Sequence, residues 1–196
     1  YYLYKTFEYR GEIDKAKDWA EKLIELGEKH QRDEIISKGN RALGVSLYRL
    51  GQYDDAMGYL ENSLKFKTKE DIEHAKAINN IGVIHSMRGD YHSALEYFMK
   101  ALAIRSTLGD RQGESIMCHN IAMNQEKLAN FSEAFESNAR AISVAETIND
   151  QFGVAAGYLH KGHMYNELKL FDKGYGAYSD GLVIAYREKI NILVSE

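Results

Sequence analysis

The sequence predicts an all-α protein, a solenoid of antiparallel helix pairs. The first observation is a hairpin-like stretch, residues 77–108, that recurs along the chain. When the residue after its turn is aligned, one column holds Ala16, Ala56, Ala94, Ala134 and Gly174, at spacings of 40, 38, 40 and 40 residues. The second is the complete absence of proline, which suits long unbroken helices. Such a hairpin cannot bury its own apolar faces, so copies stack on one another.

Two further columns share this register. An aromatic or aliphatic residue stands three places before the alanine: Ile13, Tyr53, Tyr91, Phe131 and Phe171. Twelve places before it lies a small residue in four copies: Gly44, Gly82, Ala122 and Gly162. The first copy departs, with Tyr4. Small residues permit two helices to cross at about 8–10 Å, so we expect each hairpin to cross there.

The columns divide the chain into helix pairs. We expect one domain, 1–196, with a partial repeat at 1–30 and further repeats at 33–67, 71–108, 111–148 and 151–188. Because the sequence starts within a repeat, we expect a piece of a longer protein. Residues 189–196, with four aliphatic side chains, are expected to form a tail or the start of a further helix.

Residues typical of turns and helix caps support the expected boundaries of the individual helices. In the first repeat, Tyr2, Leu3 and Phe7 have helical spacing and Gly11 makes the turn. The second repeat turns at Gly51. Between later repeats, Gly109-Asp110 and Asn149-Asp150 place a residue that tolerates the left-handed helix end before an aspartate that caps the next helix. The last repeat is rich in glycine, which predicts the loosest packing.

Composition disfavours several classes of function. The net charge is −4 and the basic residues are scattered, which disfavours a nucleic-acid partner. No apolar run reaches the roughly 20 residues of a membrane span, so we expect no membrane partner. The single cysteine, Cys118, cannot form an internal disulfide and fits a reducing, cytoplasmic location. No phosphate-binding loop or convergent catalytic set occurs, so we expect no cofactor and no enzymatic activity.

The repeat columns resemble the tetratricopeptide repeat. Its signature includes a Leu-Gly pair, a later tyrosine and then an alanine followed by an aromatic residue. Leu43-Gly44, Ile81-Gly82, Tyr165 and the pair Ala94 and Phe98 match it. The period near 40 exceeds the usual 34, and the signature tryptophan and closing proline are missing. The sequence is similar to the long-repeat subgroup found in polarity adaptors, kinesin light chains and bacterial signalling proteins.

The resemblance implies a right-handed superhelix whose first helices line a concave groove for a peptide or helix of a partner protein. The expected partner-binding residues share this lining position. They are Arg41, Asn79, Asn80, Val83, His119, Asn120, Met123 and His163. Asn80 and Asn120 are equivalent, and a carboxamide can both donate to and accept from a peptide backbone. The alternative is that each asparagine bonds a neighbouring carbonyl or faces water.

Two special sites are disfavoured. The family's clamp for chaperone carboxylates is matched by Arg41 and Asn80, whereas Val45, Ile116 and Asn120 replace its other polar residues. His160 and His163 could share a helix face, as in metal sites, but no carboxylate or cysteine lies at a matching spacing. We therefore expect no bound metal and interpret these histidines as structural or groove residues. Cys118 is interpreted as a buried, inert thiol.

Two functional hypotheses follow. The first is a scaffold that holds a segment of a partner protein in its groove. The alternative is a ligand-sensing or dimerising regulatory module from a larger bacterial signalling protein, such as a histidine kinase, a diguanylate cyclase or a transcription regulator. A homodimer through a terminal repeat is expected if an apolar solenoid end remains uncovered.

Overall fold

A computed structural model describes residues 1–66 and 71–188. It divides into two compact units, Tyr1–Ile104 and Arg105–Glu196, and each is described by itself. The tail expected at 189–196 lies outside the described residues. The described residues form α1 (Tyr2–Tyr9), α2 (Ile13–Lys29), α3 (Asp33–Arg49), α4 (Tyr53–Lys65), α5 (Ile72–Met87), α6 (Tyr91–Thr107), α7 (Arg111–Lys127), α8 (Phe131–Thr147), α9 (Gln151–Glu167) and α10 (Phe171–Arg187).

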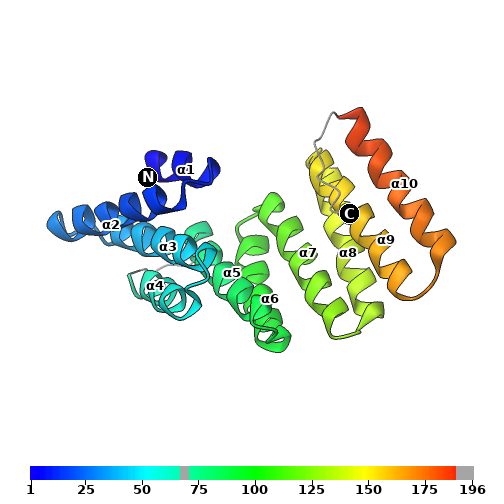
Figure 1. Cartoon of the computed structure of the whole chain (residues 1–196), viewed down its shortest axis with the longest axis horizontal. Helices are drawn as coiled ribbons and strands as arrows, with labels where there is room; N and C mark the ends of the chain where they lie inside the picture. Colours follow the sequence, from blue (N-terminus) through cyan, green and yellow to red (C-terminus); the bar gives the residue numbers. More distant parts are fainter. Residues whose placement is uncertain (67–70, 189–196) are drawn as a thin grey trace. The chain divides into compact units, whose positions relative to one another are not determined.

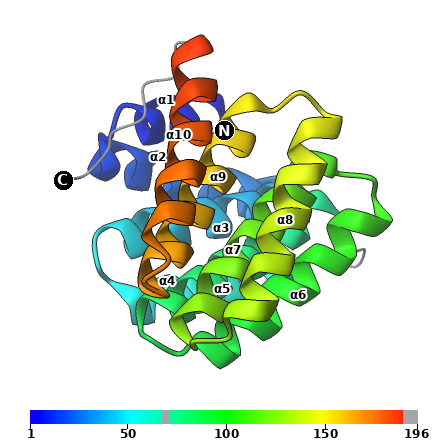
Figure 2. The same cartoon turned by 90° about the vertical axis from the view of Figure 1, so that its right-hand side faces the viewer.

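The helices pack as sequential antiparallel pairs, which confirms the predicted all-α class (Figure 1). In the first unit, α2 packs on α1 and α3, and α4 packs on α3 and α5. In the second unit, α7, α8, α9 and α10 pack in chain order (Figure 2), and α7 also contacts α9. Within the described residues, no helix is both long and apolar enough to cross a bilayer.

The predicted turn residues end and begin helices as expected. Gly51 and Gly109 adopt φ values of 78° and 69°, in the left-handed region that glycine tolerates. Asn149 adopts the same region, with a φ of 55°. The carboxylates of Asp110 and Asp150 each accept a bond of 3.0 Å from the backbone N–H three residues later. Each aspartate therefore satisfies one of the free amides of α7 or α9.

The small columns lie where the helices of a pair cross. A Cβ added to Gly82 of α5 would stand 2.9 Å from Cε1 of Phe98 on α6. Gly44 of α3 approaches Leu60 of α4 in the same way, with a corresponding distance of 2.7 Å. Larger residues would push these axes apart, so the expected role of the column is confirmed. Tyr4 is nevertheless buried in the core of the first unit.

Each unit buries apolar side chains between its helices. The core of the first unit includes Leu43, Leu47, Leu60, Ile81 and Ile84, all nearly inaccessible to solvent. In the second unit, glycines again lie at close approaches between helices. Gly157 of α9 lies against Ile142 of α8, and Gly162 of α9 lies against the ring of Tyr178 on α10.

Candidate functional site

In the second unit, the first helices of two successive pairs, α7 and α9, present adjacent faces. The α7/α9 face is defined by Ile116, Asn120 and Met123 on α7 and by Leu159 and His163 on α9. Ile116 and Met123 are exposed apolar residues, whereas Asn120 and Leu159 are half-buried. The side chain of His163 is 47% exposed. The α7/α9 face therefore combines accessible apolar contacts with hydrogen-bonding groups.

The buried side chain of Glu126 contacts His160 and His163, the histidines at the α7/α9 face. Its carboxylate, 7% exposed, lies 2.6 Å from Nε2 of His160 and 3.2 Å from Nδ1 of His163. The ammonium group of Lys127 lies 3.8 Å from the same carboxylate. The buried charge of Glu126 thus has three nitrogen partners, as a buried charge requires. These contacts fix the orientation of His163 and tie α7 to α9.

Asn138 of α8 completes this cluster. Its carboxamide nitrogen donates a bond of 2.9 Å to the carbonyl oxygen of Gly157 on α9. Its carboxamide oxygen lies 3.3 Å from Nδ1 of His160. Asn138 is buried, and the equivalent positions in the other pairs hold Ala20, Leu60, Phe98 and Tyr178. A polar residue in this otherwise apolar column is a sequence signal for a buried hydrogen-bond network.

Burial sets the protonation of the neighbouring histidines. His119 stacks edge-on against His160, with ring centroids 5.2 Å apart. Burial, together with the repulsion of His160, lowers the pKa of His119 to about 4. Burial also lowers the pKa of His160, and it outweighs the opposing attraction of Glu126. His119 is therefore neutral at physiological pH and packs as a half-buried aromatic ring.

His160 and His163, which share a side of α9, both lie beside the Glu126 carboxylate. The sequence showed no carboxylate at a matching spacing from His160 and His163, but Glu126 contacts both. It lies on the preceding first helix, 34 residues before His160, so its proximity depends on how α7 packs on α9. Within residues 1–66 and 71–188, no group of three or more histidine, cysteine, aspartate or glutamate side chains is placed to hold a metal ion. The two histidines serve the network around Glu126.

The remaining predicted binding residues lie in the first unit, and Arg41 is the most buried of them. Arg41 of α3 is buried, and its guanidinium donates to Glu73 of α5 at 2.9 and 3.1 Å and to the hydroxyl of Tyr1 at 2.5 Å. Lys76 donates to the other carboxylate oxygen of Glu73 at 2.7 Å. Although burial opposes ionisation of Glu73, Arg41 and Lys76 hold its pKa below the usual value. Arg41 therefore joins α3 to α5 from beneath the surface.

Three predicted residues of α5 are more accessible than Arg41. Asn79, Asn80 and Val83 are all half-buried. The carboxamide of Asn79 donates a long bond of 3.4 Å to that of Asn80. Together they form a small polar surface beside an apolar side chain, similar in composition to the α7/α9 face.

Cys118 supports no covalent chemistry. The side chain is buried in α7, and burial raises the pKa of its thiol. A protonated, inaccessible thiol is a poor nucleophile, in agreement with the packing role expected for this residue.

Comparisons with known proteins agree on one family. The family model described as "Tetratricopeptide repeat" matches residues 35–107 and 73–147. Outer dynein arm-docking complex subunit 4 from Danio rerio is 26% identical over 138 residues, which form 69% of this chain. The chain spans only 27% of that relative's length.

Two solved structures show the same fold. BtubC (BKLC) from P. vanneervenii has a TM-score of 0.83 and 16% identity, covering 99% of this chain and 81% of that chain. A putative kinesin light chain with TPR-like repeats from Podosopora anserina has a TM-score of 0.76 and 15% identity. That comparison covers 95% of this chain and 93% of that chain. At such identities the likeness concerns the fold.

Proposed function

We propose, from the premise that this chain belongs to the tetratricopeptide repeat family, that it holds a segment of a partner protein on the faces of its first helices. Proteins of this family are generally protein-interaction scaffolds and are usually not enzymes. The Danio rerio relative is named as a subunit of a docking complex, which supports a role in holding proteins together. The partner class is a protein or peptide.

The α7/α9 face carries this proposal. Met123 and Ile116 offer apolar contact, and Met123 adapts its shape to different side chains. Asn120 supplies a carboxamide, and His163 supplies an imidazole already oriented by Glu126. Pre-organised groups lose little conformational entropy on binding, so they contribute more of their contact energy to affinity. A segment with a backbone amide or carbonyl facing Asn120 and an apolar side chain facing Met123 fits these residues.

In the first unit, we propose that the corresponding residues of α5 bind the partner in the same way. Asn80 stands in the column of Asn120, and Val83 stands in the column of Met123. Asn79 and His119, which share another column, flank these positions. Arg41 has a supporting role, because its guanidinium is buried against Glu73 and Tyr1.

Peptide selection with matched variants tests the proposal. Peptides selected from a random display library on the intact chain are titrated by calorimetry against Asn120→Ala and His163→Ala. Loss of one hydrogen bond of about 1–1.5 kcal/mol weakens binding roughly tenfold. Met99→Ala on α6, an exposed apolar site outside both faces, is the control and should leave affinity unchanged. A library without binders, or binders insensitive to both variants, contradicts the proposal.

A further inference from the structure

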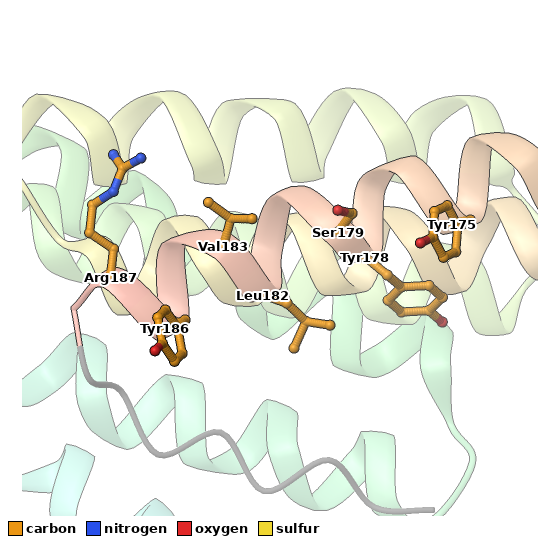
Figure 3. Close-up of a pocket in the computed structure, with 7 residues that line it drawn as sticks. All are labelled: Tyr175, Tyr178, Ser179, Leu182, Val183, Tyr186 and Arg187. Carbon is orange, nitrogen blue, oxygen red and sulfur yellow. The ribbon is translucent and has the colours of Figure 1, made fainter.

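A cleft lies between α2 and α4, the second helices of the first two pairs. Both helices pack on α3, and residues of all three helices line the cleft. Its volume is about 580 Å³. A pocket on α10, shown in Figure 3, is lined by residues of that one helix. The groups of the α2/α4 cleft instead converge from three helices, which is the arrangement of a binding site.

Carboxylates line one wall of the α2/α4 cleft. Glu21, Glu25 and Glu28 follow one another at spacings of four and three residues, which places them on one side of α2. All three residues are exposed, and none of them forms an ion pair within the described part of the chain. Like charges at these spacings repel and destabilise a helix, so a cation bound in the cleft would relieve a cost.

The opposite wall belongs to α4 and offers little positive charge. Among the described residues that line the cleft, Lys65 is the single cation, and its ammonium group donates a bond of 2.9 Å to the carboxamide of Asn62. Three carboxylates against one ammonium group give the lining a net negative charge. Tyr59 and Phe66 also line the cleft. An aromatic ring attracts a cation to its face, and a planar guanidinium can stack on it.

Asn40 of α3 lines the cleft with an unpaired acceptor. The residue is 5% exposed, and its carboxamide nitrogen donates a bond of 2.9 Å to the carbonyl oxygen of Ile36. Its carboxamide oxygen accepts no bond from residues 1–66 or 71–188. Buried acceptors are normally paired, so this oxygen suits a donor that enters the cleft. In the other repeats the same column holds Ile78, Cys118 and Tyr158.

Close helix packing fixes the apolar part of the lining. A Cβ added to Gly39 of α3 would stand 2.8 Å from Cγ1 of Ile24 on α2. Ile24 and the buried Leu43 both line the cleft. The aliphatic stem of a long basic side chain can pack on such residues while its charged end reaches polar groups. A lining held in place in this way loses little conformational entropy when a ligand binds.

We propose that the α2/α4 cleft binds an arginine side chain from a basic segment of a partner protein. A guanidinium has five N–H donors in a plane, so it can donate to Asn40 and to a carboxylate of α2 while it stacks on an aromatic ring. A lysine ammonium group has three donors and no planar face. The α2/α4 cleft shares no residue with the α7/α9 face or the face of α5. It therefore adds a second partner contact, which can be tested independently of the first.

Titration of the intact, isotope-labelled chain followed by NMR tests the site. The probe is the peptide Ac-Gly-Ser-Arg-Ser-Gly-NH2 at about 0.15 M salt, which screens long-range attraction. We expect saturable shifts of the Asn40 side-chain amide and of α2 and α4 backbone amides. A charged hydrogen bond and a stacking contact correspond to a Kd on the order of 1 mM.

Two control peptides replace the arginine. Citrulline has the shape of arginine without its charge, so its peptide should show no saturable shift. The lysine peptide should bind more weakly than the arginine peptide. Absence of saturation with the arginine peptide, or equal affinity of either control peptide, overturns the proposal.

Matched charge variants locate the binding. One variant neutralises the α2 wall with Glu21→Gln, Glu25→Gln and Glu28→Gln. It should weaken binding of the arginine peptide about tenfold or more, because the guanidinium loses its ionic partners. The control variant makes the same change of net charge at three exposed residues of α8, with Glu133→Gln, Glu136→Gln and Glu146→Gln. It should leave the affinity unchanged, and equal weakening by both variants refutes a site in the cleft.

The variant Asn40→Leu tests the buried acceptor. Leucine has a similar size but cannot accept a hydrogen bond, so binding should weaken about tenfold. Circular dichroism of this and the other variants checks that the helices are intact. Unchanged affinity of a folded Asn40→Leu variant contradicts the role of Asn40, and the α2 variant decides the proposal if Asn40→Leu does not fold.

Discussion

Acidification should destabilise the protein through His119. Its pKa is lowered from 6.5 to about 4 in the folded state, mainly because the charged imidazolium would be buried. The unfolded chain therefore binds more protons between these two values. Stability contributed by neutral His119 is complete above the unfolded pKa and is lost as the pH falls toward the folded pKa. For one group with these two pKa values, the loss between pH 7.5 and pH 5.0 is about 2 kcal/mol.

The variant His119→Phe isolates this contribution. Phenylalanine preserves a ring against His160, but it does not titrate. We expect urea denaturation at pH 7.5 and pH 5.0 to show a loss of stability in the wild type that exceeds the loss in His119→Phe by about 2 kcal/mol. The other titrating groups are common to both proteins and largely cancel in this comparison.

An exposed histidine provides the control. His92 lies on the solvent side of α6, so His92→Phe should lose as much stability on acidification as the wild type. The reasoning is refuted if wild type and His119→Phe lose the same free energy between the two pH values. It is also refuted if His92→Phe gives the same protection as His119→Phe.

Two further substitutions test packing and capping, each measured by urea denaturation against a matched control. Gly157→Ala should destabilise by about 1–3 kcal/mol, because its Cβ would stand 2.3 Å from Ile142, whereas Gly58→Ala meets no atom within 4 Å and should stabilise by about 0.5–1 kcal/mol. Equal effects would contradict the close approach. Asp150→Ala should cost about 1 kcal/mol because it removes the cap of α9. Asn130→Ala, at a helix start without a side-chain cap bond, should cost less, and the reverse order would refute the capping role.

The sequence predicted the features that depend on local chemistry and repeat register. Gly82 and Gly44 were assigned to crossings because one small residue recurs at one place in each hairpin. Gly109-Asp110 was assigned to a helix boundary because each residue type suits one side of it. Both assignments need only the chain near each residue, so periodicity and turn chemistry suffice.

The polar network around Glu126 needed the packed structure. The helical periodicity of the sequence shows on which side of α7 a residue lies. It does not show which residues of α9 lie opposite, because that depends on the position of α9 along the axis of α7. Arg41 illustrates the same limit. Its column suggests an accessible lining residue, whereas Glu73 and Tyr1 hold its guanidinium below the surface. Asn138 was detectable in principle, because it interrupts an apolar column.

The construction of the α7/α9 face has an evolutionary consequence. Asn120 and His160 occupy one column, and Met123 and His163 occupy another, yet each pair is 40 residues apart in the sequence. One nucleotide change alters one position of the surface while the neighbouring helix keeps its own side chain. Under the proposed function, preference for a partner can thus change by small independent steps. Glu126 is the exception, because its carboxylate contacts both His160 and His163, so a mutation there would change the surroundings of two side chains of α9 at once.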